Sequence, residues 1–136
     1  MKKVLTILLI LPLLLFCGFT FKKKAKPYIV LSSGSITTQT TSRIERIFAS
    51  GQRINYALIA PDGFKKSGVR LQISKQDNKT TNWGFSIVKT QDLYLTTGET
   101  SYRSYIYLKN SGNYTLQFFY LSNKDYPFAH IEFMVQ

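Results

Sequence analysis

The residues that most often carry enzyme chemistry are sparse in this 136-residue chain. The single histidine, His130, sits in a stretch where apolar and polar residues alternate, and the single cysteine, Cys17, lies in a hydrophobic run near the start. Catalysis needs titratable groups that converge on one point. One histidine without a cysteine in the same region also gives no ligand set for zinc.

The acidic residues and the serines do not indicate a catalytic site either. The seven acids are Glu45, Asp62, Asp77, Asp92, Glu99, Asp125 and Glu132. Most fall in turn-like stretches, and their spacing matches neither a calcium-binding loop nor a pair of glycosidase carboxylates. No serine lies in a Gly-x-Ser-x-Gly context, and the glycines form no phosphate-binding loop. We therefore expect a protein that is not an enzyme and that needs no metal or cofactor.

One stretch carries residue types that are suited to binding. Residues 101–109 alternate with a period of two, which puts Arg103, Tyr105, Tyr107 and Lys109 on one side of a strand. Aromatic rings beside cations stack on bases or sugars, bind acidic chains and anchor protein interfaces. Exposed tyrosine and arginine also suit strands without any ligand, because they pair across them.

Two further pairs of residues would extend this surface if their strands were neighbours of 101–109. These pairs are Arg70 with Gln72, and Phe119 with Gln117. The candidate binding face then consists of Arg70, Arg103, Tyr105, Tyr107, Lys109 and Phe119.

The elements that must position these residues are short strands, because the same alternation recurs along most of the chain. The expected strands are 28–31, 52–60, 69–74, 85–88, 93–95, 101–109, 114–121 and 128–135. Turn residues separate them, with 90–92 as the break between the two shortest, and 42–48 could form only a helical turn. The pattern predicts an all-β fold, an antiparallel β-sandwich or barrel of seven or eight short strands.

The segment 110–116, which reads Asn-Ser-Gly-Asn-Tyr-Thr-Leu, narrows this choice. It resembles the tyrosine corner of immunoglobulin-like and fibronectin-like sandwiches, where a small residue stands two before a tyrosine whose hydroxyl bonds back to nearby backbone. Leu116 occupies the place of the second cysteine of true immunoglobulin domains, so the disulfide is missing. The resemblance implies a sandwich and carries no functional residues. The alternative is a glycine-containing hairpin followed by an ordinary strand.

The first 26 residues differ from the rest of the chain. Met1-Lys2-Lys3 precedes a run, 4–21, that contains no charge, and lysines follow at 22, 23, 24 and 26. A helix of this run would be about 27 Å long, enough to span a bilayer. The pattern is typical of a signal peptide or a membrane anchor. We expect an exported domain, in the periplasm or on the outer cell surface.

Three fates of the N-terminal segment remain open. Gly18 and Thr20 would allow cleavage before Phe21. Alternatively, the segment partly resembles a bacterial lipobox with lipidation at Cys17, although Phe16 stands where a small residue belongs. The third fate is retention as an anchor.

The net charge and the chain length indicate the expected domains and the expected class of partner. The net charge is +11, but residues 27–136 hold twelve basic and seven acidic residues, a net charge of +5. We expect a signal peptide or anchor over 1–26, a linker with a first strand over 27–50, and the sandwich over 51–136. A basic surface favours acidic partners. The expected partner is another envelope protein or an anionic envelope polymer. The alternative, a nucleic-acid-binding β-barrel, fits poorly with the hydrophobic segment.

Overall fold

Eight strands form two β-sheets in the computed structural model, which describes residues 22–37, 43–77 and 84–136. The strands are β1 (Tyr28–Ser32), β2 (Ile47–Phe48), β3 (Arg53–Ile59), β4 (Gly68–Gln76), β5 (Phe85–Tyr94), β6 (Ser101–Tyr107), β7 (Gly112–Tyr120) and β8 (Ala129–Val135). The expected all-β sandwich is confirmed. The barrel alternative is wrong, because the two sheets stay separate.

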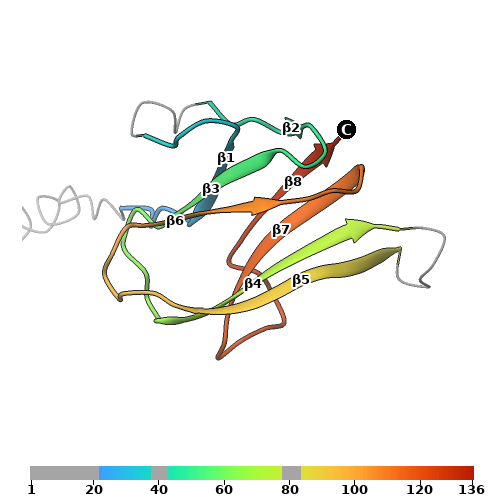
Figure 1. Ribbon diagram of the computed structural model, residues 1–136. Coiled ribbons are helices and arrows are strands. Elements are labelled where there is room, and N and C mark those ends of the chain that lie inside the picture. Colours follow the sequence, from blue (N-terminus) through green and yellow to red (C-terminus); the bar gives the residue numbers. More distant parts are fainter. Residues whose placement is uncertain (1–21, 38–42, 78–83) are drawn as a thin grey trace, which may run out of the picture.

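The two sheets lie face to face as layers (Figure 1). One contains three antiparallel strands in the order β1-β3-β6, and the other contains five in the order β2-β8-β7-β4-β5. All pairings are antiparallel except the short one between β2 and β8. Consecutive strands such as β3 and β4, or β6 and β7, belong to different sheets, as in a Greek-key sandwich.

The core lies between the sheets and follows the alternation of the sequence. Ile54, Tyr56 and Leu58 of β3 point inward, as do Leu116 and Phe118 of β7. Each fully buried side chain of this size contributes about 1.5–3 kcal/mol to stability. The largest side chains with almost no exposure among the described residues are Phe64, Phe118, Leu31, Ile54, Leu58, Leu71, Ile73, Leu116, Val30, Val69 and Val135.

The tyrosine corner is present where the chain crosses from β6 to β7. The Tyr114 hydroxyl donates a 2.6 Å hydrogen bond to the carbonyl oxygen of Asn110, four residues upstream. The Tyr114 ring is buried and stacks on Phe133 of β8, with 5.8 Å between the ring centroids. This bond and the strand arrangement make the architecture an immunoglobulin-like β-sandwich.

Two local expectations are wrong. Residues 85–88 and 93–95 belong to one ten-residue strand, β5, because Thr90, Gln91 and Asp92 pair with β4 along its length. Backbone pairing with a long neighbour outweighs the turn preference of these three residues. In the 42–48 segment, Ile47 and Phe48 form β2 beside β8 instead of a helical turn. Phe48 is buried against Phe133, and this contact favours the extended conformation.

The segment 27–50 supplies one strand to each sheet. β1 pairs with β3 from Tyr28 opposite Ile59 to Ser32 opposite Asn55, so the first sheet begins at residue 28. The expected hydrophobic helix over 4–21 lies outside the described residues. In the part that the structure describes, no helix has the length and apolar character to cross a membrane.

The strand register shows which chain segments lie at the same end of the sandwich. Tyr28 is opposite Ile59, so the lysines at 22–26 lead into the end of the domain where β3 finishes. Arg53, at the start of β3, is opposite Tyr107 at the far end. The carbonyl oxygen of Gln136 accepts a 2.7 Å hydrogen bond from the Ser50 N–H close to Arg53. The basic N-terminal flank and the Arg53–Tyr107 end are therefore at opposite ends of the sandwich.

Candidate functional site

The outer face of the three-stranded sheet carries the aromatic and basic residues expected on β6. Arg103, Tyr105 and Tyr107 point away from the core, and the two tyrosines are 47% and 56% exposed. Tyr102 and Ile106 point to the other side, toward the core. The alternation of the sequence places these five residues correctly.

Arg53 of β3 joins this group across the sheet. Its guanidinium carbon lies 3.9 Å from the centre of the Tyr105 ring, a cation–π contact. The Tyr105 and Tyr107 rings meet edge to face with 5.6 Å between their centroids. We call Arg53, Arg103, Tyr105 and Tyr107 the cationic–aromatic surface.

Asn55 holds Arg53 in this position. The Arg53 Nε–H donates to Asn55 Oδ1 at 3.1 Å, and Asn55 Nδ2 donates to the carbonyl oxygen of Gly34 at 2.9 Å. The loop that contains Gly34 is itself fixed, because Ile36 is buried with Val30 on the outer side of the sheet. A loop, an amide and a guanidinium thus form one chain of contacts that ends on an aromatic ring.

A shallow depression of about 430 Å³ lies beside this chain of contacts. Its lining includes Arg53, Arg103, Tyr105 and Asn55, together with Ser35 and Ile36. None of β1, β3 and β6 contains an acidic residue. A guanidinium presents a planar fork of donors that matches carboxylate and phosphate groups. The depression therefore favours an anionic group held between two arginines and next to an aromatic ring.

The structure does not bring all six expected residues together. Arg70 lies on β4 and Phe119 on β7, in the five-stranded sheet, so neither strand neighbours β6. Arg70 forms a two-pronged ion pair with Asp92, at 2.7 and 3.0 Å, and its guanidinium lowers the pKa of that carboxyl. Phe119 is only 8% exposed. Neither residue extends the cationic–aromatic surface, because the chain changes sheet between β3 and β4 and between β6 and β7.

Lys109 and Cys17 are the two remaining residues that the sequence analysis named as site candidates. Lys109 is exposed just beyond the end of β6, and its carbonyl oxygen accepts a hydrogen bond from the Ser50 hydroxyl. Cys17, where lipidation is one of the expected alternatives, lies outside the described residues.

His130 is exposed on the outer face of the five-stranded sheet. In residues 22–37, 43–77 and 84–136, no cluster of three or more histidine, cysteine or acidic residues could hold a metal ion.

Arg53 and Asn55 are the residues that sequence reasoning missed. The alternation of 53–60 already placed both on the outer side of their strand. The pairing of β3 with β6 was the missing information, because strands 42 or more residues apart pair by tertiary packing and not by a local signal.

The comparisons with known proteins include two distant likenesses to solved structures. No protein-family model and no curated protein matches this chain. The soluble domain of PmoD from Methylocystis sp. is 15% identical, with 81% of this chain and 90% of that one covered and a TM-score of 0.47. An immunoglobulin-like protein from Pseudomonas aeruginosa is 12% identical, with 84% and 99% covered and a TM-score of 0.46. Both likenesses are too distant to bear on the function of this chain.

Proposed function

We propose that this chain is an exported, membrane-tethered and non-enzymatic binding protein that holds an anionic polymer of the cell envelope on its cationic–aromatic surface. The observation that carries the proposal is the Arg53 guanidinium stacked on Tyr105 beside Arg103, on a sheet without acidic residues. Such an arrangement provides both charge and a ring face for a polymer that contains sugars or similar units and acidic groups.

Fixed geometry supports binding by this surface. Arg53 is already oriented by Asn55 and Tyr105, so less side-chain freedom is lost when a ligand arrives. Stacking uses the face of the guanidinium and leaves N–H donors at its edge for a carboxylate or phosphate. Tyr107, 56% exposed, adds a second ring for contact with the polymer.

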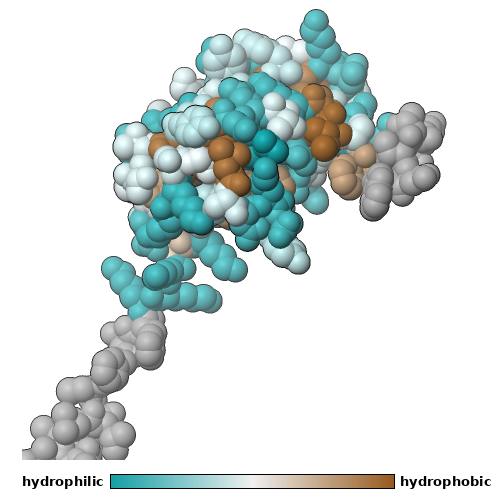
Figure 2. All heavy atoms as spheres, turned by 90° about the horizontal axis from the view of Figure 1, so that it is seen from below, coloured by the Kyte–Doolittle hydropathy of each residue, from teal (hydrophilic) through white to brown (hydrophobic). Residues whose placement is uncertain are grey.

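The position of the basic N-terminal flank supports a tether. Residues 22–26 include four exposed lysines, and they follow the uncharged run 4–21. Figure 2 shows hydrophilic residues projecting from the body of the domain. Lysines at this position attract anionic headgroups of a membrane. Because the cationic–aromatic surface is centred near the opposite end of β3 and β6, a tethered domain would present it away from the bilayer.

The binding experiment compares the loss of two positive charges on the cationic–aromatic surface with the same loss elsewhere on the domain. The full-length protein is titrated with poly(glycerol phosphate) and with a polyuronate at low and at moderate salt. The Arg53→Gln/Arg103→Gln variant should bind at least about tenfold more weakly than the parent, since charge-assisted hydrogen bonds contribute about 1.5–3 kcal/mol each. Added salt should weaken the parent's binding.

The matched control is Lys65→Gln/Lys89→Gln, which removes two exposed positive charges elsewhere. It should keep most of the affinity. An equal loss in both variants would show a general charge effect, and binding of neither polymer by the parent would refute the proposed ligand class. Tyr105→Ala/Tyr107→Ala, with no charge removed, should also lose binding if the rings take part.

Export and tethering are tested separately. Intact mass and membrane partition are measured for the protein made in a bacterial host, together with a reporter fused after Gln136. The proposal expects protein in the membrane fraction and a reporter active outside the cytoplasm. A reporter active only in the cytoplasm would refute export, and a processed protein without membrane association would refute the tether.

A further inference from the structure

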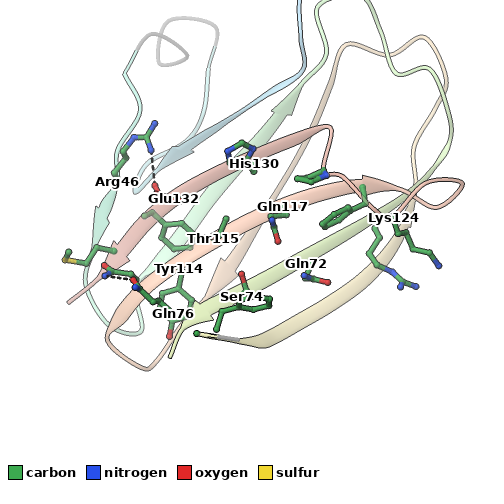
Figure 3. Close-up of a pocket in the computed structure, with 18 of the residues that line it drawn as sticks. Arg46, Gln72, Ser74, Gln76, Tyr114, Thr115, Gln117, Lys124, His130 and Glu132 are labelled. Carbon is green, nitrogen blue, oxygen red and sulfur yellow. Dashed lines mark hydrogen bonds between the residues drawn. The ribbon is translucent and has the colours of Figure 1, made fainter. Parts of the chain in front are cut away.

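The outer face of the five-stranded sheet carries a groove of about 1060 Å³. Figure 3 shows the side chains that project into it from β4, β7 and β8. This face lies on the opposite side of the sandwich from the cationic–aromatic surface. Its contacts are therefore independent of those proposed to bind an anionic polymer.

The floor of the groove is a pair of polar rows that cross three strands. In one row Gln72 is opposite Gln117, and Gln117 is opposite His130. In Figure 3 these three side chains lie side by side across the sheet. Because neighbouring strands are about 4.8 Å apart, the row presents donors and acceptors over about 10 Å.

The second row runs parallel to the first. Ser74 is opposite Thr115, and Thr115 is opposite Glu132. Together the two rows offer amide, hydroxyl, imidazole and carboxylate groups. Most of these groups both donate and accept hydrogen bonds.

The amides of the first row are available for a ligand. Gln72 and Gln117 are half-buried, yet within the described parts of the chain no side-chain hydrogen bond is found for Gln72, Gln117 or His130. Asn113 and Gln76, at one end of the groove, bond to each other at 3.3 Å. A half-buried amide that lacks a protein partner can form a hydrogen bond to a ligand with a net gain of about 0.5–1.5 kcal/mol.

The charges around the groove are largely balanced. Arg70 is paired with Asp92, and Arg46 lines the groove together with Glu132, whose carboxylate has the opposite charge. Lys124 and Asp125 both lie at the groove. An anionic ligand therefore finds no excess of positive charge here, in contrast to the other face of the sandwich.

The backbone contributes little on this face, because β4 and β7 hydrogen-bond to strands on both sides. An extended peptide binds sheets mainly through free backbone groups at an edge strand. Recognition in this groove must come from side chains that offer neutral hydrogen bonds, with apolar contact from the exposed Phe85 at the rim. A hydroxyl-rich ring with apolar C–H faces has the matching chemistry.

We propose that the groove over Gln72, Gln117 and His130 binds an uncharged glycan chain. The protein would then hold two different polymers, one on each face of the sandwich. The ligand contacts the rows through its hydroxyl groups, and Gln117 lies at the centre of the contact because it has row neighbours on both sides.

The test is a titration of the full-length protein with soluble hexamers of glucose and of N-acetylglucosamine. The protein is kept in a detergent without a sugar headgroup, so that the detergent does not compete. Binding is followed by calorimetry and by the NMR signals of the side-chain amides. At least one hexamer should bind, shift the amide signals of Gln72 and Gln117, and show little dependence on salt.

The variant Gln117→Ala should weaken this binding about tenfold, the loss expected for one or two hydrogen bonds. The matched control is Gln91→Ala, since Gln91 is exposed on β5 opposite the core residue Leu71 and so points away from the groove. Thermal unfolding checks that both variants fold. Failure of the parent to bind either hexamer, or equal affinity in Gln117→Ala and the parent, would overturn the proposal.

Discussion

Gly63 and Gly98 pack backbone against backbone where two loops meet at one end of the sandwich. A Cβ atom on Gly63 would lie 2.7 Å from the carbonyl oxygen of Gly98, and Gly63 has a φ of +75°. Two hydrogen bonds connect these loops. The Phe64 N–H donates to the carbonyl oxygen of Glu99, and the Gly98 N–H donates to the carbonyl oxygen of Phe64. The two glycines therefore allow not only the two turns but also the close contact between the two loops.

Replacing Gly63 by alanine should lower the free energy of unfolding by about 2–4 kcal/mol. The left-handed backbone costs about 1–2 kcal/mol for an L-residue, and the two loops must also separate. Gly51→Ala is the matched control, because Gly51 has a φ of +73° with no atom near its Cβ position. It should show only the backbone cost. Urea unfolding measures both, and an equal loss in the two variants would contradict the importance of the Gly63–Gly98 contact.

Tyr114→Phe should destabilise the domain by about 0.5–1.5 kcal/mol. The variant removes the hydroxyl that donates to Asn110, while the ring can still stack on Phe133. The loss of this part-buried hydrogen bond accounts for the expected destabilisation. Tyr94→Phe serves as the control, because Tyr94 is 80% exposed and its hydroxyl has no comparable bond. Thermal melting that is unchanged in Tyr114→Phe would argue against a stabilising role for the corner.

The sequence predicted the parts of the fold that depend on local signals. Alternation placed Ile54 and Leu116 in the core and Arg103 and Tyr105 on the surface, because a period of two directly encodes the two sides of a strand. The corner at Tyr114 was recognisable because its geometry depends on a few adjacent residues. These features need no knowledge of which strands are neighbours.

The rest of the site depends on pairings between distant strands. Arg53 reaches Tyr105 only because β3 lies beside β6, and Arg70 misses that surface because β4 belongs to the other sheet. The same dependence on strand pairing explains why β5 was not predicted as one strand, because pairing with β4 continues the strand through Thr90 and Asp92. The candidate binding face could therefore be predicted for one strand but not across strands.

Stability should fall at alkaline pH because of buried tyrosines. Burial raises the pKa of Tyr56 well above its usual value of 10.0, and burial also raises the pKa values of Tyr114 and Tyr120. Their stabilising contribution is complete below pH 10. As the pH rises further, these groups ionise in the unfolded chain first, so each lowers the free energy of unfolding. The largest contribution comes from Tyr56, up to about 1.4 kcal/mol per pH unit.

Tyr56→Phe tests this linkage. The ring can keep its contact with Phe118, whose centroid is 6.0 Å away, but the titrating hydroxyl is gone. The free energy of unfolding is measured in urea between pH 8 and 11. The variant should show a shallower decline above pH 10 than the parent, whatever its stability at pH 8. Parallel pH profiles would exclude Tyr56 as a source of the alkaline loss.

Asn55→Ala separates orientation from charge in the cationic–aromatic surface. Asn55 bonds to both Arg53 and Gly34, so its loss frees the guanidinium without changing the net charge. Ordering a freed arginine costs about 0.5–1.5 kcal/mol, so affinity for poly(glycerol phosphate) should fall about three- to tenfold. Asn113→Ala is the control, since Asn113 bonds to Gln76 on the other sheet. Unchanged affinity in Asn55→Ala, with Arg53→Gln/Arg103→Gln still defective, would mean that the polymer responds to positive charge alone and that the orientation of Arg53 is not used.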